Sequence, residues 1–191
     1  MCSSDLRLPR RPRGGRSQRG ADRPAHRAAR ARSELVDGVA VLEAALGSSA
    51  SSGLGYRNHK VGVFLNVFED HIGSSDRIQS KDDIVSAKEF VFQRIKPGGW
   101  AVFNADDEYV AKVFDKIPDG VHKIPVGFAF SHFDIKAHLQ SGGEAITIDE
   151  SANQIILLKG GEKRILADVS TVPWSFGGKF RPSVWNLALA H

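Results

Sequence analysis

Apolar runs divide the chain from about residue 33 onward into strand-like and helix-like segments. Residues 39–43 and 61–67 are short apolar runs that contain several Val, which is typical of buried strands. Residues 100–103 form a third run of this kind. All three have the length of a strand and are too short for a helix that crosses a core. We therefore predict three strands in this part of the chain.

A helix is predicted between the second and the third of these strands. Ser80 is followed three residues later by Asp83, which is the spacing of a capping box. Apolar side chains then recur at helical spacing, at Ile84, Ala87, Val91 and Ile95. Residues 97–99, Pro-Gly-Gly, are expected to end this helix, and residues 109–117 are predicted to form another. Strand, helix and strand in this order indicate a βαβ unit and a parallel sheet.

The pattern changes after about residue 121. Several segments alternate between apolar and polar residues and are separated by Gly-Gly or Asp/Asn turns, which predicts antiparallel hairpins. They are residues 133–139, which contain His138, and residues 144–149, 154–160 and 163–169. Residues 47–53 have the composition of a flexible loop, and residues 183–191 begin as a helix. The predicted fold class is α/β, with a parallel βαβ sheet and an antiparallel hairpin subregion.

The charge of the chain is unevenly distributed. Residues 1–32 contain ten Arg, no Lys and two Asp, a net charge of +8, whereas the rest has 16 basic and 20 acidic residues, a net charge of −4. The basic segment can be interpreted as a nucleic-acid-binding arm, as a disordered tail, or as sequence foreign to the rest. The abrupt change from Arg to Lys usage favours the last interpretation. We therefore treat residues 1–32 as a disordered or spurious segment and do not expect a nucleic-acid partner.

The composition of the chain indicates a globular protein of a reducing compartment. The hydrophobic fraction is 41%, and no apolar run reaches the roughly 18 residues that a membrane span requires. Cys2 is the single cysteine, so an internal disulfide is excluded. The N-terminus has no apolar segment of the secretory type. These features predict a cytoplasmic protein that does not contact a membrane.

Polar side chains follow each of the three predicted strands. The first strand ends at Glu43, the second at residues 69–71, Glu-Asp-His, and the third at residues 104–107, Asn-Ala-Asp-Asp. Ligands of open parallel sheets bind outside the carboxyl ends of the strands. Glu43 and His71 could together hold a divalent cation and leave positions for water and phosphate oxygens, as Mg²⁺ prefers. The alternative is that each of these residues is a solvated turn residue.

Lys88 lies beside the apolar stripe of the predicted helix. A lysine at such a position either extends along the apolar surface to reach solvent or is partly buried. A partly buried lysine has a lowered pKa, so it can serve as a nucleophile or as a modification site. Residue type alone favours the first alternative.

Five motifs in a fixed order resemble the central, ATP-binding domain of the Mur ligase family. They are "VAVLE", "GLGYRNHKVGVFLNVFEDHIG", the "AK" of Ala87-Lys88, "KPGGWAVFNADDEYV" and "VPWSFGGKFRPSVWNLALA". The resemblance covers about residues 36–190. Within the family, the hairpin at residues 142–145 and the "VP...GG" segment favour the branch of the cyanophycin synthetases. The chain from residue 33 to residue 191 is accordingly expected to be a partial Mur ligase central domain.

The resemblance implies an activity and a set of site residues. The family joins a carboxylate to an amine with ATP through an acyl phosphate, and in cyanophycin synthetases the Mur-like half adds arginine to an aspartate chain. Glu43 and His71 match metal ligands, and Lys88 matches a lysine that is carbamylated in several members. Asn186 matches the residue that lies against adenine, and Asn104 and Asp106 match the "NADD" turn. The implied cofactors are ATP and Mg²⁺, and the implied partner is a small-molecule or peptide substrate, with a homo-oligomer possible.

The chain also departs from the family pattern. No glycine-rich phosphate loop of the form G-x-x-G-K-T precedes "VLE", Leu46 stands where an arginine is expected, and Pro182 and Ser183 replace a His-Asn pair. Such a loop cradles phosphates through its backbone N–H groups and a lysine, so ATP affinity is expected to be weak. We expect a fragment, truncated at both ends, that is inactive alone and marginally stable. Alternatives are another Mur-family ligase, of peptidoglycan-precursor or folate type, and a non-catalytic remnant with a basic nucleic-acid-binding arm.

Overall fold

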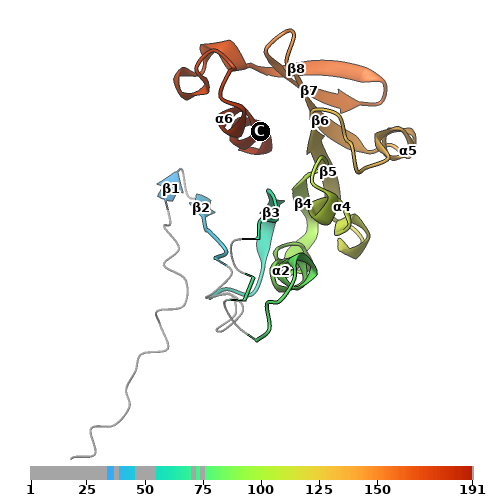
Figure 1. Ribbon diagram of the computed structural model, residues 1–191. Coiled ribbons are helices and arrows are strands. Elements are labelled where there is room, and N and C mark those ends of the chain that lie inside the picture. Colours follow the sequence, from blue (N-terminus) through green and yellow to red (C-terminus); the bar gives the residue numbers. More distant parts are fainter. Residues whose placement is uncertain (1–33, 37–38, 46–54, 70–71, 74–75, 191) are drawn as a thin grey trace, which may run out of the picture.

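The computed structural model describes residues 34–36, 39–45, 55–69, 72–73 and 76–190 (Figure 1). Its main element is a six-stranded sheet in which consecutive strands are neighbours, in the order β3-β4-β5-β6-β7-β8. The strands are β3 (His59–Phe64), β4 (Ile95–Asn104), β5 (His122–Gly127), β6 (Glu144–Asp149), β7 (Gln154–Lys159) and β8 (Glu162–Asp168). Strands β1 (Glu34–Val36) and β2 (Val39–Val41) form a separate antiparallel pair.

The sheet is parallel on one side and antiparallel on the other. Strands β3 to β6 pair in parallel, and β6 to β8 pair antiparallel. The chain connects β3 to β4 through α2 (Lys81–Lys88) and the short α3 (Phe90–Gln93). This arrangement confirms the predicted α/β class, including its antiparallel hairpin subregion.

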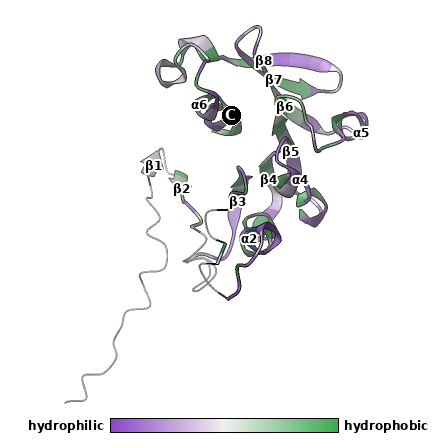
Figure 2. Ribbon diagram, viewed as in Figure 1, coloured by the Kyte–Doolittle hydropathy of each residue, from purple (hydrophilic) through white to green (hydrophobic). Residues whose placement is uncertain are grey.

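Helices cover the two faces of the sheet unequally. Helices α2, α4 (Glu108–Ala111) and α5 (Ile135–Gln140) lie on one side, and α6 (Arg181–Ala190) lies on the other (Figure 1). The described residues also form three 3₁₀ helices, η1 (Phe114–Lys116), η2 (Val169–Thr171) and η3 (Pro173–Ser175). Buried side chains form two hydrophobic cores, of which one contains the fully buried Phe92 and Phe103 and the other the fully buried Ile155 and Ala188. Figure 2 shows that β7 is largely apolar and that the outermost strand, β8, is more hydrophilic.

The part of the sheet that α6 does not cover has exposed apolar side chains. Val61, Val63 and Leu65 alternate with buried residues along and after β3, and they are 50%, 40% and 41% exposed. Trp100, opposite Val61 on β4, is 38% exposed. Among the described residues, no strand pairs with the outer edge of β3. These side chains therefore form an exposed apolar surface along β3 and β4.

The strand predicted at residues 39–43 is present but lies outside the main sheet, and the strand predicted at residues 133–139 is wrong. Residues 39–43 do not join the main sheet, because β2 pairs locally with β1, and Val39 and Val41 are 59% and 64% exposed. Residues 133–139 contribute to α5 because Asp134 caps that helix by accepting a hydrogen bond from the N–H of Ala137 at 3.0 Å. His138 therefore lies on a helix and not on a strand.

The Pro-Gly-Gly segment has a different role from the predicted one. Residues 97–99 lie within β4 as a bulge, between the His59–Ile95 pair and the Val61–Trp100 pair. A Cβ on Gly99 would lie 2.3 Å from the carbonyl oxygen of Lys60. The glycine is thus required where the two backbones approach closely. The helix predicted at residues 109–117 is also interrupted, since α4 ends at Ala111 and η1 follows it.

Some predicted features lie outside the described residues. They are the Arg-rich segment at residues 1–32, the loop at residues 47–53, the departure at Leu46, and His71.

Candidate functional site

A turn directly after β4 connects the carboxyl ends of three strands. Within this turn, the N–H of Asp106 donates to Asn104 Oδ1 at 2.9 Å. The Asp106 carboxylate accepts hydrogen bonds from the N–H groups of Phe128 at 2.7 Å, Ala129 at 3.3 Å and Ser131 at 2.9 Å. These bonds fix the loop that follows β5. Both side chains predicted for the "NADD" turn are therefore engaged by backbone donors.

Asp107 connects the same turn to β3 and to α4. Its Oδ1 accepts from the N–H groups of Tyr109 and Val110, both at 3.0 Å, and so caps α4. Its Oδ2 accepts from the N–H of Val67 at 3.1 Å, three residues after β3 ends. One carboxylate thus holds the segment that leads toward His71 against the end of β4.

The start of α2 lies at the same edge of the sheet. The predicted capping box is confirmed: the N–H of Asp83 donates to Ser80 Oγ at 3.2 Å, and the N–H of Ser80 donates to Asp83 Oδ2 at 2.9 Å. Hydrogen bonds from Gln79 and Ser80 hold the pKa of Asp83 below its ordinary value.

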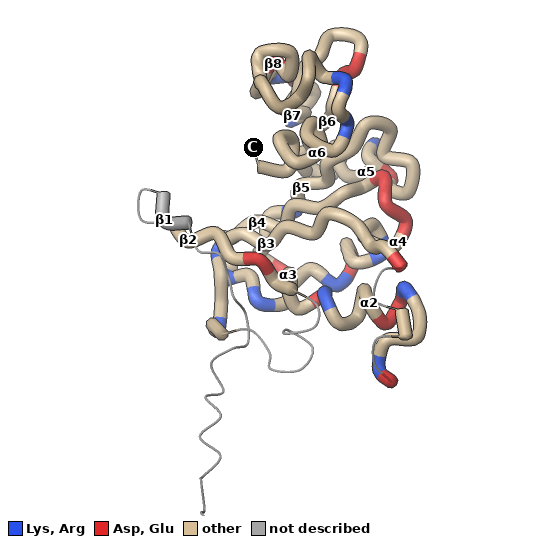
Figure 3. Tube along the Cα trace, turned by 60° about the vertical axis from the view of Figure 1, so that its left-hand side comes forward, with Lys and Arg blue, Asp and Glu red and all other residues tan. Residues whose placement is uncertain are grey.

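Lys81 connects α2 to the segment that precedes His71. Its Nζ lies 3.0 Å from Glu69 Oε1 and 5.3 Å from the centroid of the Tyr109 ring. Chiefly because of the bond to Glu69, the pKa of Lys81 is raised. On the other side, Lys112 lies 4.8 Å from the same ring centroid. Figure 3 shows acidic and basic residues interspersed around α2 and α4.

The structure does not bring the other predicted site residues together. Glu43 is exposed and follows β2, outside the main sheet. Lys88 is half-buried at the last position of α2, about 10 Å along the helix axis from Lys81. Asn186 is exposed on α6, on the side away from the buried Val184 and Ala188.

A metal site is not complete within the described residues. In this part of the chain, no three His, Cys, Asp or Glu side chains gather closely enough to hold an ion. The Asp106 and Asp107 carboxylates are occupied by backbone N–H groups, and Glu43 stands apart from them. The described side chains alone therefore do not fit a Mg²⁺ site.

Sequence reasoning missed a cavity of about 280 Å³ beside the start of α6. Arg181 lies at one side, where it forms three hydrogen bonds with Glu150 and its guanidinium lies 4.8 Å from the Phe128 ring centroid. Lys179 and the Gly177-Gly178 pair, from the "VP...GG" motif, also line it. The signal that could have found it was this glycine pair, since both glycines have positive φ angles, 68° and 82°.

No helix in the described part of the chain has the length and apolar character needed to cross a membrane.

Comparison with known proteins identifies the family. Residues 28–161 match the Mur ligase middle domain. A six-stranded sheet with a parallel part and an antiparallel end is consistent with that domain. The chain therefore belongs to the Mur ligase family.

Individual relatives point to two branches of this family. The chain is 34% identical over 144 residues to a cyanophycin synthetase of Trichormus variabilis, a match that covers 74% of this chain and 15% of that protein. It is 32% identical over 143 residues to a cyanophycin synthetase of Synechocystis sp., which covers 73% and 16%. A UDP-N-acetylmuramoylalanine--D-glutamate ligase of Rickettsia prowazekii is 40% identical over 55 residues, which covers 29% and 12%. The chain thus spans about 15% of the length of the cyanophycin synthetases that it matches.

Proposed function

We propose that this chain is the nucleotide-binding middle domain of an ATP-dependent ligase that joins a carboxylate to an amine through an acyl phosphate. The observation that carries the proposal is the match of residues 28–161 to the Mur ligase middle domain. The position of the hydrogen-bonded turn supports it, because Asp106 and Asp107 fix loops at the carboxyl ends of parallel strands, where ligands of such sheets bind.

We further propose that the reaction is the addition of arginine to an aspartate chain. Support comes from the extent of the similarity to cyanophycin synthetases, which covers 74% of this chain in one case. The similarity to the ligase of Rickettsia prowazekii, over 55 residues, favours a second candidate, in which D-glutamate is added to UDP-N-acetylmuramoylalanine.

Three residues are proposed to act on phosphate and metal. Glu43 and His71 would hold Mg²⁺, and Lys88 would contact phosphate or, carbamylated, serve as a further carboxylate. When bound, Mg²⁺ would neutralise the charge of the phosphates during phosphoryl transfer. In the structure, Glu43 and Lys88 lie apart from the "NADD" turn.

Nucleotide binding is proposed at the same side of the molecule. Asn186 would lie against adenine. Lys179, which lines the cavity beside α6, would supply positive charge for phosphate, whereas Arg181 is paired with Glu150. Asn104 and Asp106 are proposed to act by holding the turn in place, because their oxygens are hydrogen-bonded to backbone N–H groups.

The proposal is tested with the protein encoded by the complete gene that contains these residues. Phosphate release from Mg·ATP is measured with two substrate pairs, an aspartate-chain primer with arginine, and UDP-N-acetylmuramoylalanine with D-glutamate. We expect release, and a mass increase of the primer, with the first pair only. Activity with the second pair only would replace the arginine assignment by the second candidate. No release with either pair, from a folded protein, would contradict both.

A further inference from the structure

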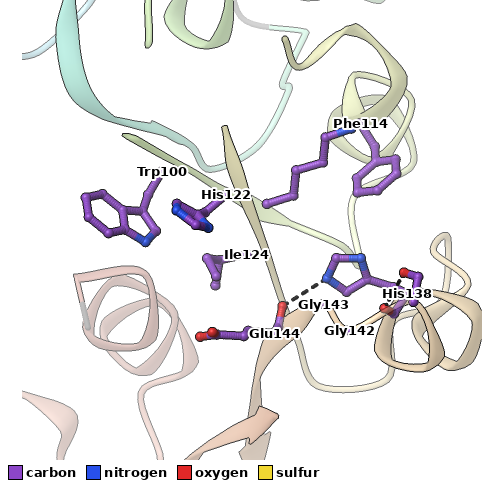
Figure 4. A pocket seen from close by; sticks show the side chains of 10 residues that line it. Trp100, Phe114, His122, Ile124, His138, Gly142, Gly143 and Glu144 are labelled. Carbon is purple, nitrogen blue, oxygen red and sulfur yellow. Dashed lines mark hydrogen bonds between the residues drawn. The ribbon is translucent and has the colours of Figure 1, made fainter. Parts of the chain in front are cut away.

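A second cavity, of about 360 Å³, opens at the amino ends of β5 and β6 (Figure 4). It lies at the edge of the sheet opposite the Asn104–Asp107 turn, so it is separate from the site described above. It is lined by two imidazoles, two aromatic rings, one lysine and one carboxylate, from His122, His138, Trp100, Phe114, Lys123 and Glu144.

One wall of the cavity consists of two stacked rings. The centroids of Trp100 and His122 are 5.4 Å apart, and their planes are inclined by 24°. These residues are also register partners on β4 and β5. The wall is thus held by backbone pairing as well as by ring contact.

The opposite wall is fixed by a glycine turn. His138 Nε2–H donates to the carbonyl oxygen of Glu144 at 3.0 Å, as Figure 4 shows. A Cβ on Gly143 would lie 2.3 Å from His138 Nε2, so only glycine leaves room for the imidazole. The ring also contacts Phe114 and Phe133 edge-on. The shape of the cavity is therefore largely preformed.

The charges at this cavity do not balance. Glu144 is its only lining carboxylate among the described residues, and it is paired with Lys159, whose Nζ lies 2.5 Å from Glu144 Oε1. Lys123 is half-buried, and its Nζ lies 4.3 Å from the Phe114 ring centroid. Within the described part of the chain, Lys123 forms no ion pair. Among the described residues, the ammonium group of this lining lysine therefore has no carboxylate partner.

We propose that this cavity binds a small carboxylate, with Lys123 as its charge partner. Because Glu144 is already paired with Lys159, an anion would be the counter-charge of Lys123, whereas a cation would be repelled by it. The volume is at the lower end of the range of small-molecule sites, so the ligand is of amino-acid size. The inference does not depend on the ligase activity, because it uses residues at the other edge of the sheet.

The test is a titration of the ¹⁵N-labelled 191-residue chain with succinate, followed by NMR, with inorganic phosphate and chloride as parallel probes. We expect succinate to shift the amides of Lys123 and Glu144 and the indole N–H of Trp100. Lys123→Gln should weaken binding about tenfold. Lys163→Gln, an exposed lysine of β8 outside the cavity, should leave binding unchanged. Thermal melts of both variants establish that they remain folded.

Three results would overturn the proposal. They are the absence of shifts at tens of millimolar succinate, equal weakening by both substitutions, and shifts with phosphate but none with succinate.

Discussion

The carboxylate of Asp106 accepts a hydrogen bond from the N–H of Phe128 at 2.7 Å, across 22 residues of sequence. This contact joins the end of β4 to the loop after β5. The N–H groups of Ala129 and Ser131 donate to the same carboxylate, so this one side chain fixes the start of the loop that follows β5. The turn thus holds loops in place at the edge of the sheet where the ligase site is proposed.

Asp106→Ala is expected to destabilise the chain. It leaves three backbone N–H groups without their acceptor, and loss of hydrogen bonds to a charged group costs about 2–3 kcal/mol. Urea unfolding measures the change. Asp115→Ala, at an exposed position of η1, is the control and should change the unfolding free energy by less than about 0.5 kcal/mol. Equal effects of the two substitutions would show that the Asp106 contacts do not hold the loop.

Ser80→Ala removes the hydroxyl that caps α2 and should cost about 1 kcal/mol. Ser86→Ala, within the same helix and exposed, should be neutral or slightly stabilising because alanine favours the helix. Thermal melts of the two variants compare these positions directly. A Ser86→Ala variant as unstable as Ser80→Ala would contradict the capping assignment.

Gly143→Ala should destabilise the chain by about 1–3 kcal/mol, because the added methyl group meets the His138 ring at 2.3 Å. Gly55→Ala provides the matched control, since nothing lies within 4 Å of a Cβ at that position. The unfolding free energies of the two variants are compared in urea. If Gly143→Ala were as stable as Gly55→Ala, the imidazole would not be fixed as described.

His59 should make stability depend on pH near and below 6.5, the ordinary pKa of histidine. Burial lowers its pKa below 6.5, and its Nε2–H donates to the Val91 carbonyl oxygen at 2.6 Å. The unfolded chain then binds more protons than the folded chain, so the free energy of unfolding should rise with pH through this range. In His59→Gln this rise should be smaller, whereas His132→Gln, at an exposed position, should retain it. An unchanged pH dependence in His59→Gln would refute the assignment.

Self-association is expected through the exposed face of β3. Val61 and Val63 present apolar side chains beside an edge that is unpaired among the described residues. Val63→Lys should reduce light scattering of the concentrated chain without lowering its melting temperature. Scattering that is unchanged by this substitution would place the association elsewhere.

Local signals predicted helix α2 and the antiparallel strands β6 to β8 well. The capping residues Ser80 and Asp83 and the apolar spacing from Ile84 onward locate α2, because these interactions act within one or two helical turns. The hairpins of β6 to β8 follow from alternation and turn residues.

The features that were not predicted depend on contacts between residues that are distant in sequence. Nothing local to residues 39–43 indicates that β1 is their partner, and nothing near Gly99 indicates that the Lys60 backbone approaches it. The roles of Asp106 and Asp107 depend on donors at Phe128 and Val67, which are distant in sequence. The polar residues at the strand ends were found by sequence, but their hydrogen-bonding functions were not.

Trapping of the acyl phosphate by hydroxylamine tests the ligase proposal most directly. The protein encoded by the complete gene is incubated with Mg·ATP, an aspartate-chain primer and hydroxylamine, without arginine, and the hydroxamate is measured. We predict ATP-dependent hydroxamate formation that is lost in His71→Ala and retained in the control His132→Ala. A folded protein that forms no hydroxamate, or forms it equally well in His71→Ala, would contradict the proposed reaction or the proposed metal site, respectively.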